Sequence, residues 1–105
     1  MSRDILVERA LKRREVFRRL WEHLETVKSV VLKLDPEAEV FLFGSVAEGN
    51  YNYSSDIDVL IVTEQQPAKI YSELWRAGIK EPFEIHVHRP EKAIFYKDRA
   101  KLVRI

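Results

Sequence analysis

Apolar residues recur at spacings of three and four between residues 3 and 34, which is the period of one face of an α-helix. The pattern predicts one long helix or two abutting helices, ending at Asp35-Pro36 because the residue before a proline is disfavoured in the helical region. Arg14 interrupts the apolar stripe, so we expect the first turns to project beyond the core. The residues of the stripe are Val7, Ala10, Leu11, Phe17, Leu20, Trp21, Leu24, Val27 and Val31.

Three later segments have the composition of β-strands, over residues 39–43, 56–63 and 83–88. The first is rich in aromatic and aliphatic residues, and the second is the most β-branched stretch of the chain. The third alternates apolar and polar side chains, as a strand with two different faces does.

Proline and glycine positions predict two further helices. Residues 67–77 begin with Pro67 and are followed by Gly78, which matches the preference of proline for the first helical turn and of glycine for the position after the last. Pro90 opens a helix over residues 90–101. The tail that follows fits either a continuation of that helix or a short edge strand.

The connections between the strands predict the topology of the sheet. Strands two and three are joined through a helix and should be parallel, whereas strands one and two are joined by a short loop and should be antiparallel. We therefore expect one α+β domain over residues 1–105, in the order α-β-β-α-β-α, with helices flanking a small mixed sheet of three to four strands. The long helix would precede a core over residues 38–90, and the helix over residues 90–101 would follow it.

Composition narrows the class of protein. A chain of 105 residues with 46% hydrophobic residues fits one globular domain and excludes a disordered chain. The absence of cysteine excludes disulfides and thiolate metal sites. No apolar run has the length of a membrane span, and the N-terminus is too charged for a signal peptide, so we expect a cytoplasmic location.

The net charge of +1 predicts no partner, but basic residues concentrate between residues 9 and 19. This stretch fits either a solvated helix face or a surface for nucleic acid or an acidic partner protein. It contains Arg9, Lys12, Arg13, Arg14, Arg18 and Arg19 against a single acidic residue, Glu15.

Two aspartates stand at the start of the second strand. Because successive strand side chains point to opposite faces, Asp56 and Asp58 should share one face, while Ile57, Val59 and Ile61 should face the core. Carboxylates that close to one another repel, and divalent cations would relieve the repulsion. Their hard oxygen ligands suit Mg²⁺ or Mn²⁺.

The third strand offers a further carboxylate for the same face. If it lies beside the second strand, Glu84 points where Asp56 and Asp58 point, and three carboxylates on adjacent strands are what a two-metal site requires. His86 and His88 lie on the Glu84 face. They could form a Glu-x-His-x-His zinc ladder, line the rim of the pocket or face water.

The turn at Gly44-Ser45 is a candidate phosphate site. A glycine at a strand end lets the backbone approach a phosphate, and the following amides, including that of Val46, can donate hydrogen bonds. The Ser45 hydroxyl can add another. The alternative is an ordinary turn followed by a helix capped by a serine.

Aromatic residues leave several alternatives open. Tyr51 and Tyr53 lie in the loop after this turn and could stack on a base or pack the loop. Trp21 and Trp75 occupy helical apolar positions and are assigned to the core or to an interface rather than to substrate.

These motifs together resemble the signature of the nucleotidyltransferase superfamily that includes DNA polymerase beta, and most closely its short prokaryotic members, the minimal nucleotidyltransferases. The resemblance rests on Phe43-Gly44-Ser45, followed after residues 46–55 by Asp56-Ile57-Asp58-Val59, and extends from about Val40 to Val87.

The resemblance implies the nucleotidyltransferase fold and transfer of a nucleoside monophosphate, AMP from ATP, to a hydroxyl. It implies that Asp56 and Asp58 bind two Mg²⁺ ions, with Mn²⁺ as the alternative, and that a third acid, assigned to Glu84, completes the metal site and helps to activate the acceptor. Nucleotide binding is assigned to Gly44, Ser45, Val46 and Ser55, although many relatives carry a basic residue where this chain has Val46.

The acceptor and the partner are also implied only by resemblance. Relatives of this length resemble one half of toxin–antitoxin pairs, in which the partner is a helical HEPN ribonuclease and the acceptor, in some pairs, is a tyrosine of that toxin. The chain has no room for an acceptor-binding domain, so a second subunit or a separate protein must present the acceptor. The alternative functions are a binding module that neutralises a partner without turnover and a nucleic-acid-binding protein that uses the basic stretch.

Overall fold

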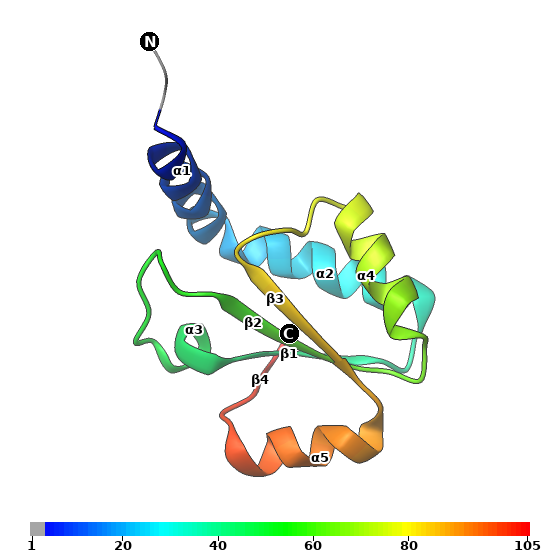
Figure 1. The fold of residues 1–105 in the computed structure, drawn as a ribbon. Helices are drawn as coiled ribbons and strands as arrows, with labels where there is room; N and C mark the ends of the chain where they lie inside the picture. Colours follow the sequence, from blue (N-terminus) through cyan, green and yellow to red (C-terminus); the bar gives the residue numbers. More distant parts are fainter. Residues whose placement is uncertain (1–3) are drawn as a thin grey trace.

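A four-stranded sheet forms the centre of the computed structural model, which describes residues 4–105. Its strands are β1 (Glu39–Phe43), β2 (Ile57–Val62), β3 (Phe83–His88) and β4 (Val103–Arg104), arranged in the order β3-β2-β1-β4 (Figure 1). β1 and β2 are antiparallel and β2 and β3 are parallel, which confirms both predicted pairings. The C-terminal tail forms the short edge strand β4, antiparallel to β1.

Five helices surround the sheet: α1 (Ile5–Arg18), α2 (Leu20–Leu34), α3 (Gly44–Glu48), α4 (Pro67–Arg76) and α5 (Pro90–Arg99). The segment predicted over residues 3–34 is therefore two abutting helices, with its first residue outside the described part of the chain. They separate at Arg19, whose φ of −111° and ψ of 32° depart from helical values. Within residues 4–105, no helix is both long and apolar enough to cross a membrane.

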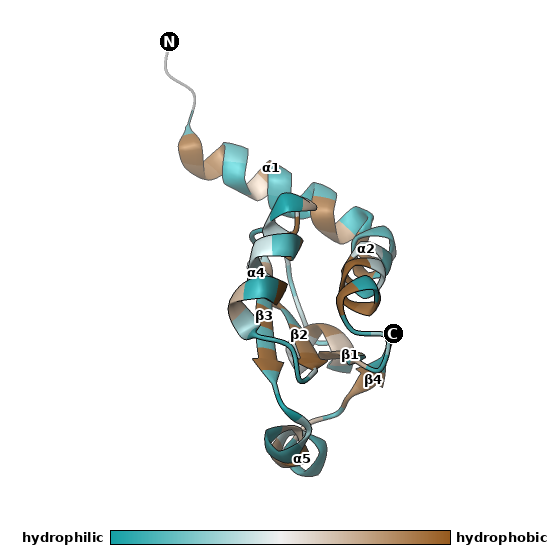
Figure 2. Ribbon diagram, turned by 90° about the vertical axis from the view of Figure 1, so that its right-hand side faces the viewer, coloured by the Kyte–Doolittle hydropathy of each residue, from teal (hydrophilic) through white to brown (hydrophobic). Residues whose placement is uncertain are grey.

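α1 extends away from the sheet, as expected for the turns before Arg14 (Figures 1 and 2). Of the stripe residues in this helix, Phe17 is buried, while Val7 and Leu11 remain 49% and 48% exposed. The prediction of a core or interface position for the two tryptophans is wrong as regards the core, because Trp21 is 57% and Trp75 61% exposed.

The main core lies between one face of the sheet and the helices α2 and α4. Ile57, Val59 and Ile61 are completely buried there, as the alternation of β2 predicted. The helices contribute fully or almost fully buried side chains to the same cluster, among them Leu24, Val27 and Val31 from α2 and Ile70 and Leu74 from α4.

The opposite face of the sheet carries a smaller core. Phe41, Leu60 and Val62 pack there with Ala93 of α5, and Tyr96 lies partly buried against them. α5 begins just after β3 ends and runs back along this face, so that its Tyr96 packs against Phe43 at the end of β1 (Figure 1).

One edge of the sheet is formed by β3, beside which α4 lies. The Tyr71 hydroxyl of α4 donates a hydrogen bond of 3.1 Å to the backbone carbonyl of Ile85 in this edge strand. At the other edge, the Arg104 side chain of β4 forms an ion pair of 2.9 Å with Glu39.

Candidate metal and phosphate site

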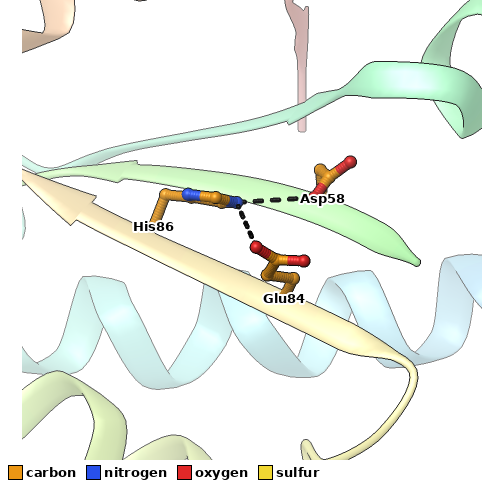
Figure 3. A group of neighbouring side chains, drawn as sticks. All are labelled: Asp58, Glu84 and His86. Carbon is orange, nitrogen blue, oxygen red and sulfur yellow. Dashed lines mark hydrogen bonds and ion pairs between the residues drawn. The ribbon is translucent and has the colours of Figure 1, made fainter.

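Two carboxylates and a histidine converge where β2 and β3 run side by side (Figure 3). Asp58 pairs with Glu84 and Leu60 pairs with His86, so the three polar side chains share one face of the sheet. His86 Nε2 lies 3.4 Å from Asp58 Oδ1 and 3.6 Å from Glu84 Oε1. If one possible ligand atom is taken from each residue, the three atoms all lie within 4.8 Å of one another.

The donor set of this acidic group, defined as Asp58, Glu84 and His86, fits a divalent cation. Carboxylate oxygens suit Mg²⁺ and Mn²⁺, and an imidazole nitrogen suits transition metals such as Mn²⁺ or Zn²⁺. The side chains of Asp58 and His86 are 24% and 26% exposed, and that of Glu84 is 55% exposed, so the group is open to a ligand from solvent. Sequence reasoning placed His86 on this face but did not assign it to the central group.

Gly44 lies directly against the acidic group. Its φ is +75°, and a Cβ added to it would stand 3.2 Å from Asp58 Cγ and closer still to Asp58 Oδ2. The register of the antiparallel pair accounts for the contact, because Phe43 pairs with Asp58 and the chain turns into α3 at the next residue. The predicted phosphate-binding turn and the acidic strand are therefore in contact.

Two other residues assigned to nucleotide binding, Val46 and Ser55, have side chains that already contact the protein itself. The Val46 side chain is buried in the main core, so only its backbone is left for a ligand. The Ser55 hydroxyl accepts a hydrogen bond of 3.2 Å from the Asn52 amide and closes a turn. The assignments of Ser45, Val46 and Ser55 stay predictions.

Asp56 lies outside the acidic group of the described residues. It precedes β2, so the strand begins one residue later than predicted. Its Oδ1 lies 4.0 Å from Arg13 Nη2, and its side chain is 56% exposed. Its role as a metal ligand stays a prediction.

Arg13 of α1 holds the loop that leads to Asp56. Its Nε donates to the carbonyl of Tyr53 at 2.8 Å, and its Nη2 donates to the carbonyl of Ser55. Its Nη1 also lies 3.5 Å from Glu81 Oε1, in the segment before β3. In the sequence, Arg13 stands out only as part of a basic stretch, since no local pattern reveals bonds to carbonyls that lie 40 and 42 residues further along the chain.

A second arginine of α1 contacts the segment before β3. Arg9 donates two hydrogen bonds to the carboxylate of Glu81, the shorter of 2.6 Å. The hydrogen bond from Arg9 holds the pKa of the Glu81 carboxyl below its usual range. α1 therefore contacts the segments that precede both β2 and β3.

Aromatic rings surround the acidic group on the side of α5. The Phe43 ring lies edge-on to His86 at 5.1 Å and to Tyr96 at 5.5 Å between centroids. His88 Nε2 lies 3.0 Å from the Tyr96 hydroxyl, and burial lowers the pKa of His88, assisted by the positive charge of Lys92. His88 therefore belongs to the aromatic cluster rather than to the acidic group.

The two loop tyrosines pack on α1. The Tyr51 ring stacks on Phe17 at 5.3 Å between centroids, and the Tyr53 ring lies 5.5 Å from Phe17. The structure thus gives both rings a packing role in the loop, which was one of the two alternatives.

A separate pocket of about 490 Å³ opens where β2 ends, at the end of the sheet opposite the acidic group. Thr63 lies in its wall, and its hydroxyl donates a hydrogen bond of 2.6 Å to Asp35. Because the pocket is lined by four carboxylates, it would repel a triphosphate, and we do not assign the nucleotide to it. These carboxylates are Asp35, Glu37, Glu39 and Glu64.

Comparisons with known proteins agree with the geometry. Residues 24–104 match the family described as nucleotidyltransferase domain. A crystal structure of a "putative nucleotidyltransferase" is 30% identical with a TM-score of 0.65, over 79% of this chain and 97% of that chain. A second crystal structure, of a "putative nucleotidyltransferase" from Sulfolobus solfataricus, shares the fold with a TM-score of 0.58. It is 24% identical and covers 99% of this chain and 89% of that chain. No curated protein sequence matches the chain significantly. The family match covers most of the chain and includes the Gly44-Ser45 turn and the Asp58 strand, so the chain belongs to the nucleotidyltransferase domain family.

Proposed function

We propose that this chain transfers AMP from ATP to a hydroxyl group of an acceptor. The observation that carries the proposal is the contact between the Gly44 turn and Asp58, because it puts the turn proposed for the phosphates next to the acidic group proposed for the metal ions. In the reaction, the acceptor oxygen bonds to the α-phosphorus, the bond from that phosphorus to the pyrophosphate oxygen breaks, and the acceptor hydroxyl loses its proton.

The roles of the residues follow from their positions. Asp58 and Glu84, together with Asp56, would hold two Mg²⁺ ions, with Mn²⁺ as the alternative. When bound, the ions supply charge neutralisation at the phosphates and acidify the acceptor hydroxyl. The amides after Gly44 and the Ser45 hydroxyl would bind the terminal phosphates. Glu84, the most exposed member of the acidic group, is best placed to accept the acceptor proton.

The acceptor in this proposal belongs to a partner protein, a tyrosine of a helical HEPN-type toxin. The surface of α1 supports a protein partner, since contiguous apolar side chains left exposed indicate an interaction site. Ile5 and Leu6 are 70% and 71% exposed, and Val7 and Leu11 follow on the same helix. A second copy of this chain would be the alternative occupant.

Nucleic-acid binding through the basic stretch is less well supported. The Arg13 side chain is 15% exposed and bonded within the chain, and Arg9 pairs with Glu81. Arg18 and Arg19 both lie within ion-pair distance of Glu15. Much of the positive charge is therefore already matched by carboxylates, which weakens the attraction for phosphates.

Mg²⁺-dependent ATP binding, measured by calorimetry, tests the site. Wild-type protein is expected to bind ATP with Mg²⁺ and to lose at least about tenfold in affinity when Mg²⁺ is removed or when Asp58→Asn removes a carboxylate charge. Glu64→Gln removes an exposed carboxylate at the far end of the sheet and should leave the affinity unchanged. Equal affinities for all three proteins would contradict the proposal.

Transfer is tested with ATP labelled at the α-phosphate, incubated with Mg²⁺ and the candidate partner. The proposal expects label on the partner in the presence of wild-type protein and none with Asp58→Asn. Label that appears only from γ-labelled ATP would indicate phosphoryl transfer instead. Metal-dependent binding of ATP without transfer, combined with stable binding of the partner, would favour a neutralising module over an enzyme.

A further inference from the structure

A pocket of about 340 Å³ adjoins the proposed site on the side of α5. Phe43 forms one wall, and the last turns of α5 form the rest. The lining residues are Phe43, Phe95, Tyr96, Arg99 and Ala100. Because Phe43 immediately precedes Gly44, the same short segment borders both the pocket and the phosphate-binding turn.

Aromatic rings connect the pocket to the acidic group. Phe43 and Tyr96 both line the pocket, and their rings lie 5.1 Å and 6.2 Å from the ring of His86. His86 in turn lies 3.4 Å from Asp58. The pocket therefore begins one aromatic side chain away from the group that would hold the metal ions.

The chemistry of the lining fits a flat heteroaromatic ring. Phe95 lines the pocket and is 60% exposed, so its ring is accessible to a base that could stack on it. Arg99 also lines the pocket, and its planar guanidinium can stack on a ring. The lining is otherwise apolar, and a nucleobase offers the π-face that such a lining binds.

We propose that this pocket binds the base of the nucleotide whose phosphates bind at Gly44-Ser45. The inference rests on the proposed function and adds the part of the site that holds the nucleoside. The base is favoured over a side chain of the acceptor because Phe43 borders both subsites, and a nucleoside triphosphate is a single molecule that carries its base and its phosphates together.

The test compares Mg²⁺-ATP with Mg²⁺-tripolyphosphate, which has the phosphates without the base. Phe95→Ala is expected to weaken ATP binding roughly tenfold, the effect of losing one stacking contact, and to leave tripolyphosphate binding unchanged. Phe95→Tyr keeps a ring and should restore the ATP affinity. Ile94→Ala, at the neighbouring and similarly exposed position that does not line the pocket, should bind ATP as wild type does.

The outcomes separate this inference from the proposed function. Wild-type protein that binds neither ligand would overturn both. Wild-type protein that binds both, with Phe95→Ala unchanged toward ATP, would overturn the base site alone. Unchanged ATP affinity with a reduced rate of transfer would assign the pocket to the acceptor and overturn the inference. Thermal unfolding of Phe95→Ala close to that of wild type would show that any lost affinity is not due to lost folding.

Discussion

Gly44 combines two requirements that only glycine meets at this position. Its backbone is left-handed, with φ of +75°, and the space where a Cβ would lie is occupied by the carboxylate of Asp58. The first requirement concerns the turn alone, since an L-residue is strained there. The second couples the turn to the acidic group, because any side chain at this position must displace Asp58.

Gly44→Ala is therefore expected to lower stability by about 1–2 kcal/mol from the backbone alone, and also to abolish metal-dependent nucleotide binding. Urea unfolding and calorimetry measure the two effects. Gly78→Ala is the matched control, because Gly78 has φ of +89° and open space around an added Cβ. It should lower stability by a similar amount while ATP binding persists. Loss of binding in both variants would mean that backbone strain alone explains the effect.

The residues of the site differ in how far sequence could predict them. Asp58 and Glu84 were predicted to lie together from strand alternation and from the parallel pairing, and the structure brings them together. Asp56 was expected beside Asp58, but it lies before β2, where strand alternation does not determine its direction. His86 follows the same alternation as Glu84, yet its contact with both carboxylates depends on the strand register, which sequence alone does not give.

Among the elements, α1 shows what helical periodicity does and does not establish. The apolar stripe correctly predicted helix, because spacing reports which side chains share a face. It does not report what covers that face. The chain changes direction at Arg19, and the stripe is exposed before Phe17. After Phe17 it is buried at Leu24, Val27 and Val31, although Trp21 stays exposed. In the described part of the chain, polar contacts of Arg9 and Arg13 hold α1 near the segments before β2 and β3.

Arg13→Ala is expected to release the loop of residues 50–56 from α1. Loss of the two hydrogen bonds to backbone carbonyls, made by a side chain that is 15% exposed, should lower stability by about 1–3 kcal/mol. Amide hydrogen exchange over residues 50–56 should become faster, and the affinity for Mg²⁺-ATP should fall because Asp56 is the last residue of this loop.

Arg14→Ala is the control for this prediction. Arg14 is exposed on the same helix, and its removal should change stability by less than about 0.5 kcal/mol. Unchanged exchange in the loop of Arg13→Ala would show that the loop is held without Arg13, which would remove its positioning role.

At the scale of the whole molecule, the main core and the candidate site lie on opposite faces of the sheet. The face under α2 and α4 contains the main core, whereas the opposite face carries the acidic group beside a smaller cluster. Sequence predicted this division for β2, since its apolar row is continuous and its other face begins with Asp58. It did not predict where α5 ends and β4 begins, because the residues of the tail are compatible with both helix and strand. Only the pairing with β1 decides between them.

Ile61→Ala is expected to cost about 2–5 kcal/mol in urea unfolding, because it leaves a cavity in the main core at a fully buried position. That is a large part of the roughly 5–15 kcal/mol typical of a domain. The folded fraction should still bind Mg²⁺-ATP, since Ile61 faces away from the acidic group. Ile94→Ala, at a position 56% exposed, should change stability by less than about 0.5 kcal/mol. Similar costs for the two variants would contradict the place of Ile61 in the main core, and loss of Mg²⁺-ATP binding by the folded fraction would contradict the division between the faces.

The hydrogen bond from Tyr71 to Ile85 has a consequence for self-association. β3 is an edge strand, and an unpaired edge is a template on which another chain can add a strand and begin to aggregate. The tyrosine hydroxyl occupies one of its carbonyls, and at the other edge β4 is only two residues long and bears the Arg104–Glu39 pair. Because one edge is bonded to α4 at Ile85 and the other is short and charged, assemblies of this chain should form through helix surfaces rather than by continuing the sheet from one molecule into the next.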